Sequence, residues 1–162
     1  MNISLENTRH HSDVRQLHVE AFPSSVESEL VEQLRKDDDG VISLVALEED
    51  NVVGHVMFSR MNAPFKALGL APISVSPHWQ RLGIAAQLIE EGVKQAKAGG
   101  WEGIFVLGDP AYYERFGFSV GAAEKFKSPY AGPYLMLLIL NEDSIIPWSG
   151  RIEYAPAFSA LG

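Results

Sequence analysis

The sequence predicts an α/β (α+β) fold. Two groups of strands indicate it, and a long helix lies within the second group. One group is a meander, because the strand-like runs 41–47 and 52–59 are joined by the turn 48–51. The other is a strand, helix and strand: apolar positions at helical spacing separate the apolar runs 68–76 and 102–107. Meander strands run antiparallel, whereas strands joined through a helix run parallel in a right-handed unit. The sequence therefore predicts a sheet that mixes both directions.

The remaining elements flank these two groups. Ile3 and Leu5 alternate as a short first strand, and a helix is expected over 12–21. Ser24 to Glu27 is typical of a capping box that begins a second helix reaching about Lys36. The later elements are, in order, a short helix from Asp109, a loop over 123–132, a strand over 134–140 and a short strand near 151–154.

Length and composition fit one domain over residues 1–162. The absence of cysteine excludes disulfides, thiolate metal sites and an acyl-cysteine intermediate. The formal net charge of −8 argues against nucleic-acid binding, which needs clustered Lys and Arg. No signal peptide or membrane-length apolar run is present, so we expect a cytoplasmic protein without membrane contact. Asp37-Asp38-Asp39 lacks EF-hand spacing, so we expect a solvated turn there and no metal site.

The turn from Gln80 to Ala85, between strand 68–76 and the long helix, is the strongest functional signal. Gly83 and Ala85 are small enough to let a ligand approach the backbone. The first N–H groups of a helix have no partner within it and, with the helix dipole, favour a phosphate or pyrophosphate. The turn has neither the Gly-Lys-Ser/Thr of a P-loop nor the three glycines of a dinucleotide-binding turn.

A second motif, Gly-Asp-Pro-Ala-Tyr-Tyr-Glu-Arg-Phe-Gly-Phe, occupies 108–118. Asp109 before Pro110 is typical of a helix start, and Gly117 of a helix end. Gln-x-x-Gly-x-Ala at 80–85 resembles the coenzyme A pyrophosphate loop of the GNAT superfamily of N-acetyltransferases. The second motif resembles the Phe-Tyr-x-x-x-Gly-Phe helix of that superfamily, and its full run is similar to one bacterial subgroup of predicted N-acetyltransferases.

The resemblance implies a GNAT fold. Its central sheet would be mixed, with about six to seven strands, helices on both faces and a splay between the fourth and fifth strands. Acetyl-CoA would be the co-substrate. The implied binding residues are Ile73, Ser74, Val75, Gln80, Arg81, Leu82, Gly83, Ile84 and Ala85. A β-bulge is expected at 73–75, where it would aim an N–H at the thioester oxygen.

The implied reaction moves the acetyl group to a primary amine, of a small molecule or a protein, by direct attack through a tetrahedral intermediate. Tyr113, four residues before Gly117, would protonate the departing thiolate. Tyr112 is expected in the core, because neighbours on a short helix cannot both face the site.

The general base stays open, because no Asp or Glu lies on strand 68–76. His55 is a candidate, although a lone histidine within a strand is more often structural. Glu27 and Glu29 are expected near the substrate side, and helix capping explains Glu27 equally well.

A non-catalytic acyl-CoA-binding or sensing module of the same fold is the main alternative function. Oxygen acceptors and longer acyl donors are weaker alternatives. The acceptor is expected near Phe22-Pro23 and the segment 123–133, neither of which has a readable code. The oligomeric state also stays open, with a homodimer as one alternative.

Overall fold

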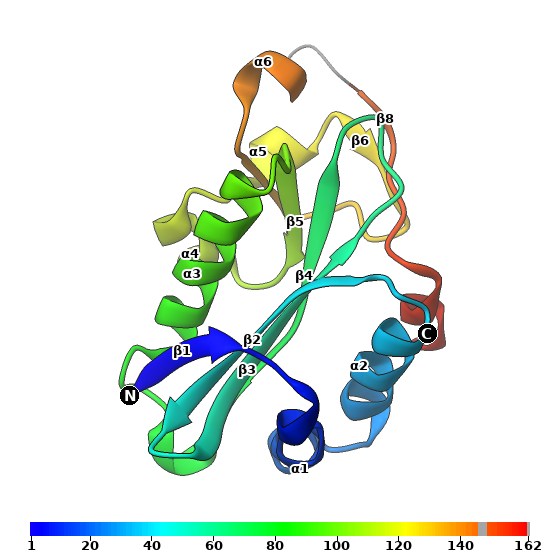
Figure 1. Cartoon of the computed structure of the whole chain (residues 1–162). Helices are drawn as coiled ribbons and strands as arrows, with labels where there is room; N and C mark the ends of the chain where they lie inside the picture. Colours follow the sequence, from blue (N-terminus) through cyan, green and yellow to red (C-terminus); the bar gives the residue numbers. More distant parts are fainter. Residues whose placement is uncertain (146–148, 162) are drawn as a thin grey trace.

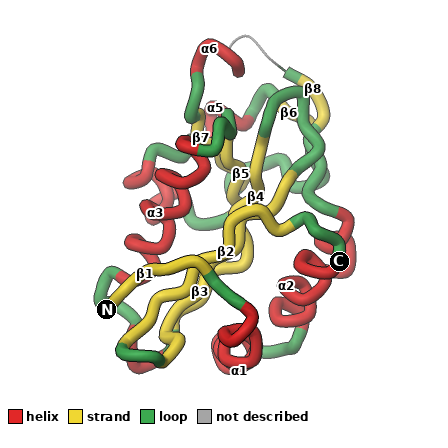
Figure 2. The backbone as a smooth tube through the Cα atoms, viewed as in Figure 1, coloured by secondary structure: helices red, strands yellow, loops and turns green. Residues whose placement is uncertain are grey.

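The computed structural model describes residues 1–145 and 149–161. Its centre is a six-stranded sheet in the order β1-β2-β3-β4-β5-β7 (Figures 1 and 2). These strands span Asn2–Leu5 (β1), Gly40–Glu48 (β2), Asn51–Arg60 (β3), Ala67–Val75 (β4), Gly103–Leu107 (β5) and Leu135–Ile139 (β7). Neighbouring strands are antiparallel except β4 and β5, which are parallel. The predicted mixed sheet is confirmed.

Helices cover both faces of the sheet, as predicted. The long helices span His11–Ala21 (α1), Val26–Lys36 (α2) and Ile84–Ala98 (α3). Successive side chains of a strand point to opposite faces, so Val45 and Leu47 of β2 pack with α1 and α2, whereas Leu44 and Ala46 pack with α3. In Figure 1 the helices α1 and α2 accordingly lie across the sheet from α3. Because each face buries its own apolar cluster, a one-residue slip of β2 would move every side chain into the cluster on the other face, so packing on both faces specifies the register.

The sheet splays between β4 and β5. The two strands pair only over 67–69 and 103–105. Beyond that point β4 continues to Val75 along β3 alone, so among the described residues its outer half has no strand on the β5 side. A bulge places Ala71 and Pro72 opposite the single residue Met57. It lies just before the predicted position at 73–75.

Short elements complete the chain. They are η1 (Thr8–His10), η2 (Pro77–Trp79), α4 (Pro110–Tyr113), η3 (Glu114–Phe116), α5 (Val120–Ala123), α6 (Glu142–Ile145) and η4 (Pro156–Leu161). Asp109 starts α4 as predicted, because its carboxylate accepts a hydrogen bond from the Ala111 N–H at 3.0 Å. Gly117 ends η3 with a φ of +97°. No helix in the described part of the chain has both the length and the apolarity needed to span a bilayer.

The structure corrects the sequence prediction at three places. The predicted capping box is wrong: Ser25 is the N-cap of α2 without a capping side-chain bond, and its hydroxyl donates to Glu29. The predicted loop 123–132 contains β6 (Phe126–Lys127). The predicted tail strand is β8 (Gly150–Arg151), which pairs with β6 in a separate sheet. Two-residue strands are too short for a period to show in the sequence.

Candidate functional site

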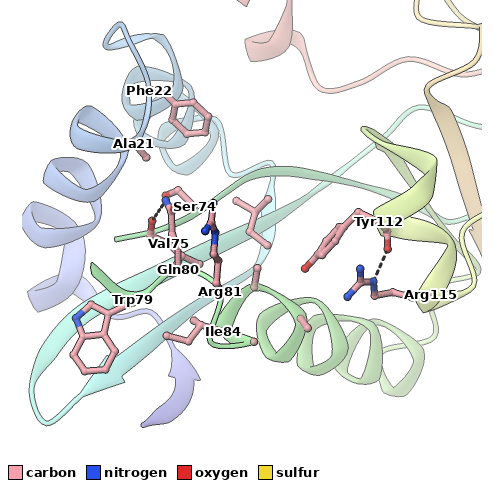
Figure 3. A pocket seen from close by; sticks show the side chains of 14 residues that line it. Ala21, Phe22, Ser74, Val75, Trp79, Gln80, Arg81, Ile84, Tyr112 and Arg115 are labelled. Atoms are coloured by element: carbon pink, nitrogen blue, oxygen red, sulfur yellow. Dashed lines mark hydrogen bonds between the residues drawn. The ribbon is translucent and has the colours of Figure 1, made fainter. Parts of the chain in front are cut away.

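A cavity of about 590 Å³ lies beside the outer half of β4 (Figure 3). Its walls come from the end of α1, β4, the turn into α3, and the α4–η3 segment. The lining residues are Ala21, Phe22, Ile73, Ser74, Val75, Trp79, Gln80, Arg81, Gly83, Ile84, Ala85, Ala86, Tyr112 and Arg115. This volume is typical of a site for a small molecule or cofactor.

The turn into α3 is held open towards the cavity. The Gln80 side chain donates from Nε2 to the Val75 carbonyl oxygen at 3.1 Å, which ties the turn to the end of β4. Arg81 and Gly83 have φ values of +66° and +84°. Glycine adopts this conformation freely, whereas it costs a residue with a Cβ about 1–2 kcal/mol. No side chain among the described residues caps α3, so the N–H groups of its first turn remain available to a ligand.

Two guanidinium groups face the cavity from opposite sides. Figure 3 shows Arg81 on the turn, and Arg115 of η3 next to Tyr112 of α4. Arg115 is fixed by a bond from its Nε to the Tyr112 carbonyl oxygen at 3.0 Å and by its position 4.4 Å above the Tyr112 ring. Neither arginine joins an ion pair within the described ranges. In a chain of net charge −8, two uncompensated cations beside free helix N–H groups make this cavity suitable for an anion.

The cavity brings together eight of the nine residues that the sequence predicts for acetyl-CoA. They are Ile73, Ser74, Val75, Gln80, Arg81, Gly83, Ile84 and Ala85. The ninth, Leu82, does not line it and is 62% exposed. Leu82 lies between the two residues of positive φ, where the tight turn directs its side chain to solvent.

The two tyrosines of α4 are arranged differently from the prediction. Tyr112 lines the cavity, and Figure 3 shows its phenol pointing into it, so the expected core position of Tyr112 is wrong. Tyr113 is not among the described lining residues; its ring packs edge-on against Phe118 and beneath Gly108, where a Cβ would lie 2.4 Å from Tyr113 Cε2. Residues that follow each other in a helix point about 100° apart. Tyr113 therefore takes the inward side, and Tyr112 the side that Arg115 covers.

Burial raises the pKa of both phenols. It raises the pKa of Tyr113 to about 12, with Tyr112 adding to the effect, and it also raises the pKa of Tyr112. Both side chains therefore carry their proton at neutral pH.

The base candidates lie outside the cavity wall. His55 on β3 is 0% exposed and lies between two polar partners: its Nδ1 is 2.8 Å from His18 Nε2, and its Nε2 is 2.8 Å from Ser43 Oγ. Glu27 and Glu29 also do not line this cavity. Among the described residues no three His, Asp or Glu side chains form a group that could hold a metal ion.

The sequence prediction missed His18, which contacts Ser74 of the cavity wall: Ser74 Oγ lies 2.9 Å from His18 Nδ1. Burial lowers the pKa of His18 from 6.5 to about 4, and the Arg35 charge adds to this. Burial, followed by the charges of His18, Arg35 and His11, lowers the pKa of His55 well below 6.5. Both rings are therefore neutral at neutral pH.

Trp79 and Arg115 of the wall were also missed. Arg115 follows Tyr112 by three residues, a spacing that places two side chains on the same helix face. That spacing was a usable signal. Nothing local in the sequence marks Trp79.

Comparisons with known proteins agree with this geometry. The sequence matches the family described as "Acetyltransferase (GNAT) family" over residues 11–118. It is 36% identical over 131 residues to the uncharacterized N-acetyltransferase YjhQ of Escherichia coli K12, covering 75% of this chain and 72% of that protein. Among solved structures, the GNAT family N-acetyltransferase YhbS of Escherichia coli in complex with CoA superposes with a TM-score of 0.93 at 29% identity, over 99% of this chain and 93% of that one.

A GNAT family acetyltransferase from Brucella melitensis in complex with acetyl-CoA superposes with a TM-score of 0.81 at 31% identity, over 97% of each chain. The family match covers most of the sequence, and its residues include β4, the turn into α3 and the helix of the two tyrosines. The chain therefore belongs to the GNAT family of acetyltransferases.

Proposed function

We propose that this protein is an acetyl-CoA-dependent N-acetyltransferase that moves the acetyl group to a primary amine. The observation that carries the proposal is the cavity at the splay, where free N–H groups of α3 and two uncompensated arginines meet the open edge of β4. Two structures of similar proteins contain CoA and acetyl-CoA, which supports the same donor here.

The residues of the cavity fit this donor in chemical type. The backbone N–H groups of 81–85 suit the pyrophosphate, and the Arg81 and Arg115 side chains add positive charge. The unpaired edge of β4 at Ile73 to Val75 suits the amide groups of the pantetheine arm, which would pair with it as an added strand does. Gln80 keeps the turn and the strand in fixed relation, because its side chain bonds the Val75 carbonyl.

In the proposed reaction the neutral amine attacks the thioester carbonyl directly. A nitrogen–carbon bond forms, the carbon–sulfur bond breaks, and the thiolate takes a proton. We assign that proton to Tyr113, on the strength of the family motif, its place beneath Gly108 at the end of β5, and its protonated state. Tyr112 would form the wall that the bound donor contacts.

The acceptor would enter beside Phe22, which lines the cavity at the end of α1. The other segment expected to bind it, 123–133, lines a separate hollow around Glu124 and Pro133 and is not part of this proposal. The chain would act as one domain, since Ala155 and Phe158 of the tail pack into the cluster beneath α2. The cytoplasmic location and a homodimer stay predictions.

The test is a thiol-release assay with acetyl-CoA and a panel of amines: benzylamine, phenethylamine, spermidine and a peptide with a free amino terminus. The matched variants Tyr112→Phe and Tyr113→Phe each remove one phenol oxygen from the same helix. We expect Tyr113→Phe to lower kcat by about 10²–10⁴-fold while the Kd for acetyl-CoA is kept. Tyr112→Phe should keep most of kcat.

Other results have distinct meanings. A loss confined to Tyr112→Phe would move the proton donor to Tyr112. Tight acetyl-CoA binding without thiol release for any amine would favour the non-catalytic acyl-CoA-binding module and contradict the proposed activity.

A further inference from the structure

A continuous chain of hydrogen-bonded side chains leads from the cavity wall into the protein. Ser74 Oγ lies 2.9 Å from His18 Nδ1, and His18 Nε2 lies 2.8 Å from His55 Nδ1. His55 Nε2 lies 2.8 Å from Ser43 Oγ, which donates to Glu6 Oε1 at 2.9 Å. His18 comes from α1 and the others from strands β4, β3 and β2 and the end of β1. Both histidines are 0% exposed.

Glu6 fixes the direction of every bond in this chain. An ionised carboxylate only accepts, so the Ser43 hydroxyl donates to Glu6 and its oxygen accepts from the Nε2–H of His55. The Nδ1 of His55 is then an acceptor and takes the Nε2–H of His18. The Nδ1 of His18 accepts in turn from the Ser74 hydroxyl. The oxygen of Ser74 is left with a free lone pair at the cavity wall.

Among the described residues, the charged side chains in contact with this hydrogen-bonded chain lie at its inner end, around Glu6. Arg35 binds both oxygens of the Glu6 carboxylate through Nε and Nη2. His11 stands 4.0 Å from the same carboxylate and is 42% exposed, so this end lies next to solvent. Burial first, and the Arg35 charge as a further cause, lower the pKa of both rings and keep them neutral, and each ring then has one donor and one acceptor nitrogen.

The cavity itself offers no alternative base. None of its described lining residues is an Asp, Glu or His, yet an amine that attacks a thioester must lose a proton. Ser74 is the lining residue whose side chain is bonded onward to a titratable group. Packing alone does not require two buried imidazoles at the α1–β3 contact, because apolar side chains would fill it without burying polar atoms.

We propose that Ser74, His18, His55 and Ser43 form a proton relay that carries the proton of the attacking amine from the cavity to Glu6. This proposal rests on the proposed acetyl transfer. The amine nitrogen bonds to the acetyl carbon and gives its proton to Ser74 Oγ, whose own proton passes to His18 Nδ1. The Nε2 proton of His18 then passes to His55 Nδ1, and the Nε2 proton of His55 passes to Ser43 Oγ. The Ser43 proton passes to Glu6.

The balance is one proton lost by the nitrogen and one gained by the carboxylate, with neither ring charged at the end. The carbon–sulfur bond breaks, and the thiolate takes the separate proton assigned above to Tyr113, whose phenolate regains a proton from solvent and so balances the one that Glu6 releases. Glu6 then releases its proton to solvent beside His11. Rotation of the hydroxyls and exchange of the ring tautomers restore the starting direction.

The first test breaks the relay far from the substrate. Ser43→Ala removes one hydroxyl of the relay, Ser43→Thr keeps it, and Ser59→Ala is the matched control. Ser59 is a strand serine like Ser43; it is fully buried, and its hydroxyl has no hydrogen-bond partner among the described residues. The assay is thiol release with the best acceptor of the amine panel, between pH 6 and 9, together with the Kd for acetyl-CoA.

We expect Ser43→Ala to lower kcat at pH 7 by about 10²-fold and to leave the Kd for acetyl-CoA unchanged. Both rates should rise with pH while the amine is largely protonated, because each enzyme needs a neutral amine, and the loss in kcat of the variant should persist at every pH from 6 to 9. Ser43→Thr and Ser59→Ala should follow the wild type. Glu6→Gln should match Ser43→Ala, and the double variant should lose no more than either single one, because both break the same relay.

The second test needs no acceptor. With ¹⁵N-labelled histidine, the nitrogen chemical shifts of the whole protein at pH 7 should report neutral Nε2–H tautomers for both His18 and His55. An Nδ1–H tautomer or an imidazolium at either ring would overturn the relay. A wild-type level of kcat in Ser43→Ala would overturn it as well, while the proposed activity stood. Absence of thiol release in the wild type would instead overturn the activity.

Discussion

Acid should destabilise this protein through His18. The pKa of its ring is lowered from 6.5 to about 4, chiefly by burial and secondly by Arg35. Above pH 6.5 the ring is neutral in the folded and unfolded chains alike, and it contributes no pH dependence. Below pH 6.5 the unfolded chain takes up the proton first, so the free energy of unfolding falls until the folded ring also titrates near pH 4.

The size of the loss follows from that difference of pKa values. It is about 1 kcal/mol at pH 6, about 2 kcal/mol at pH 5 and about 3 kcal/mol below pH 4, relative to pH 8. His18→Gln removes the titration but keeps a donor and an acceptor towards Ser74 and His55. The assay is urea unfolding of the wild type and the variant at pH 8 and pH 5.

Between these two pH values the variant should lose about 2 kcal/mol less stability than the wild type. His78→Gln makes the same exchange at an exposed ring and should lose as much as the wild type. Equal losses in His18→Gln and the wild type would refute the reasoning, because they would mean that His18 does not titrate differently in the folded protein.

Three further predictions concern the supports of the site. Asp109→Ala removes the N-cap of α4 and should lower Tm by about 3 °C in a thermal melt, whereas Asp109→Asn keeps the acceptor and should keep Tm. Gly92→Ala would place a Cβ 2.1 Å from Phe58 Cε1, an overlap expected to cost about 1–3 kcal/mol of unfolding free energy in urea. Arg81→Ala should weaken CoA binding about fivefold by calorimetry, with the difference shrinking as salt is added, and the exposed Arg9→Ala should leave the affinity unchanged.

The sequence was sufficient for the parts of the site whose signal is local. The turn 80–85 is recognisable from a glycine where φ must be positive and from the helix that follows it, and five of its six implied binding residues line the cavity. The start of α4 was equally readable, because Asp109 and Pro110 act on the next few backbone groups.

The parts that escaped prediction depend on contacts between distant residues. His18 meets His55 across 37 positions and Ser74 across 56, and no sequence period links them. The exchange of sides by Tyr112 and Tyr113 was hidden too, since both are aromatic and the helix has only four residues. The packing of Tyr113 against Phe118 and Gly108, and of Tyr112 against Arg115, decides which phenol faces the cavity.

The most direct test of the proposed donor site is a crystal structure of this protein with bound acetyl-CoA. The geometry predicts pyrophosphate oxygens about 2.7–3.2 Å from N–H groups within 81–85, and the pantetheine arm paired with Ile73 to Val75. A coenzyme bound elsewhere on the protein, or no bound coenzyme at a saturating concentration, would contradict the assignment of this cavity.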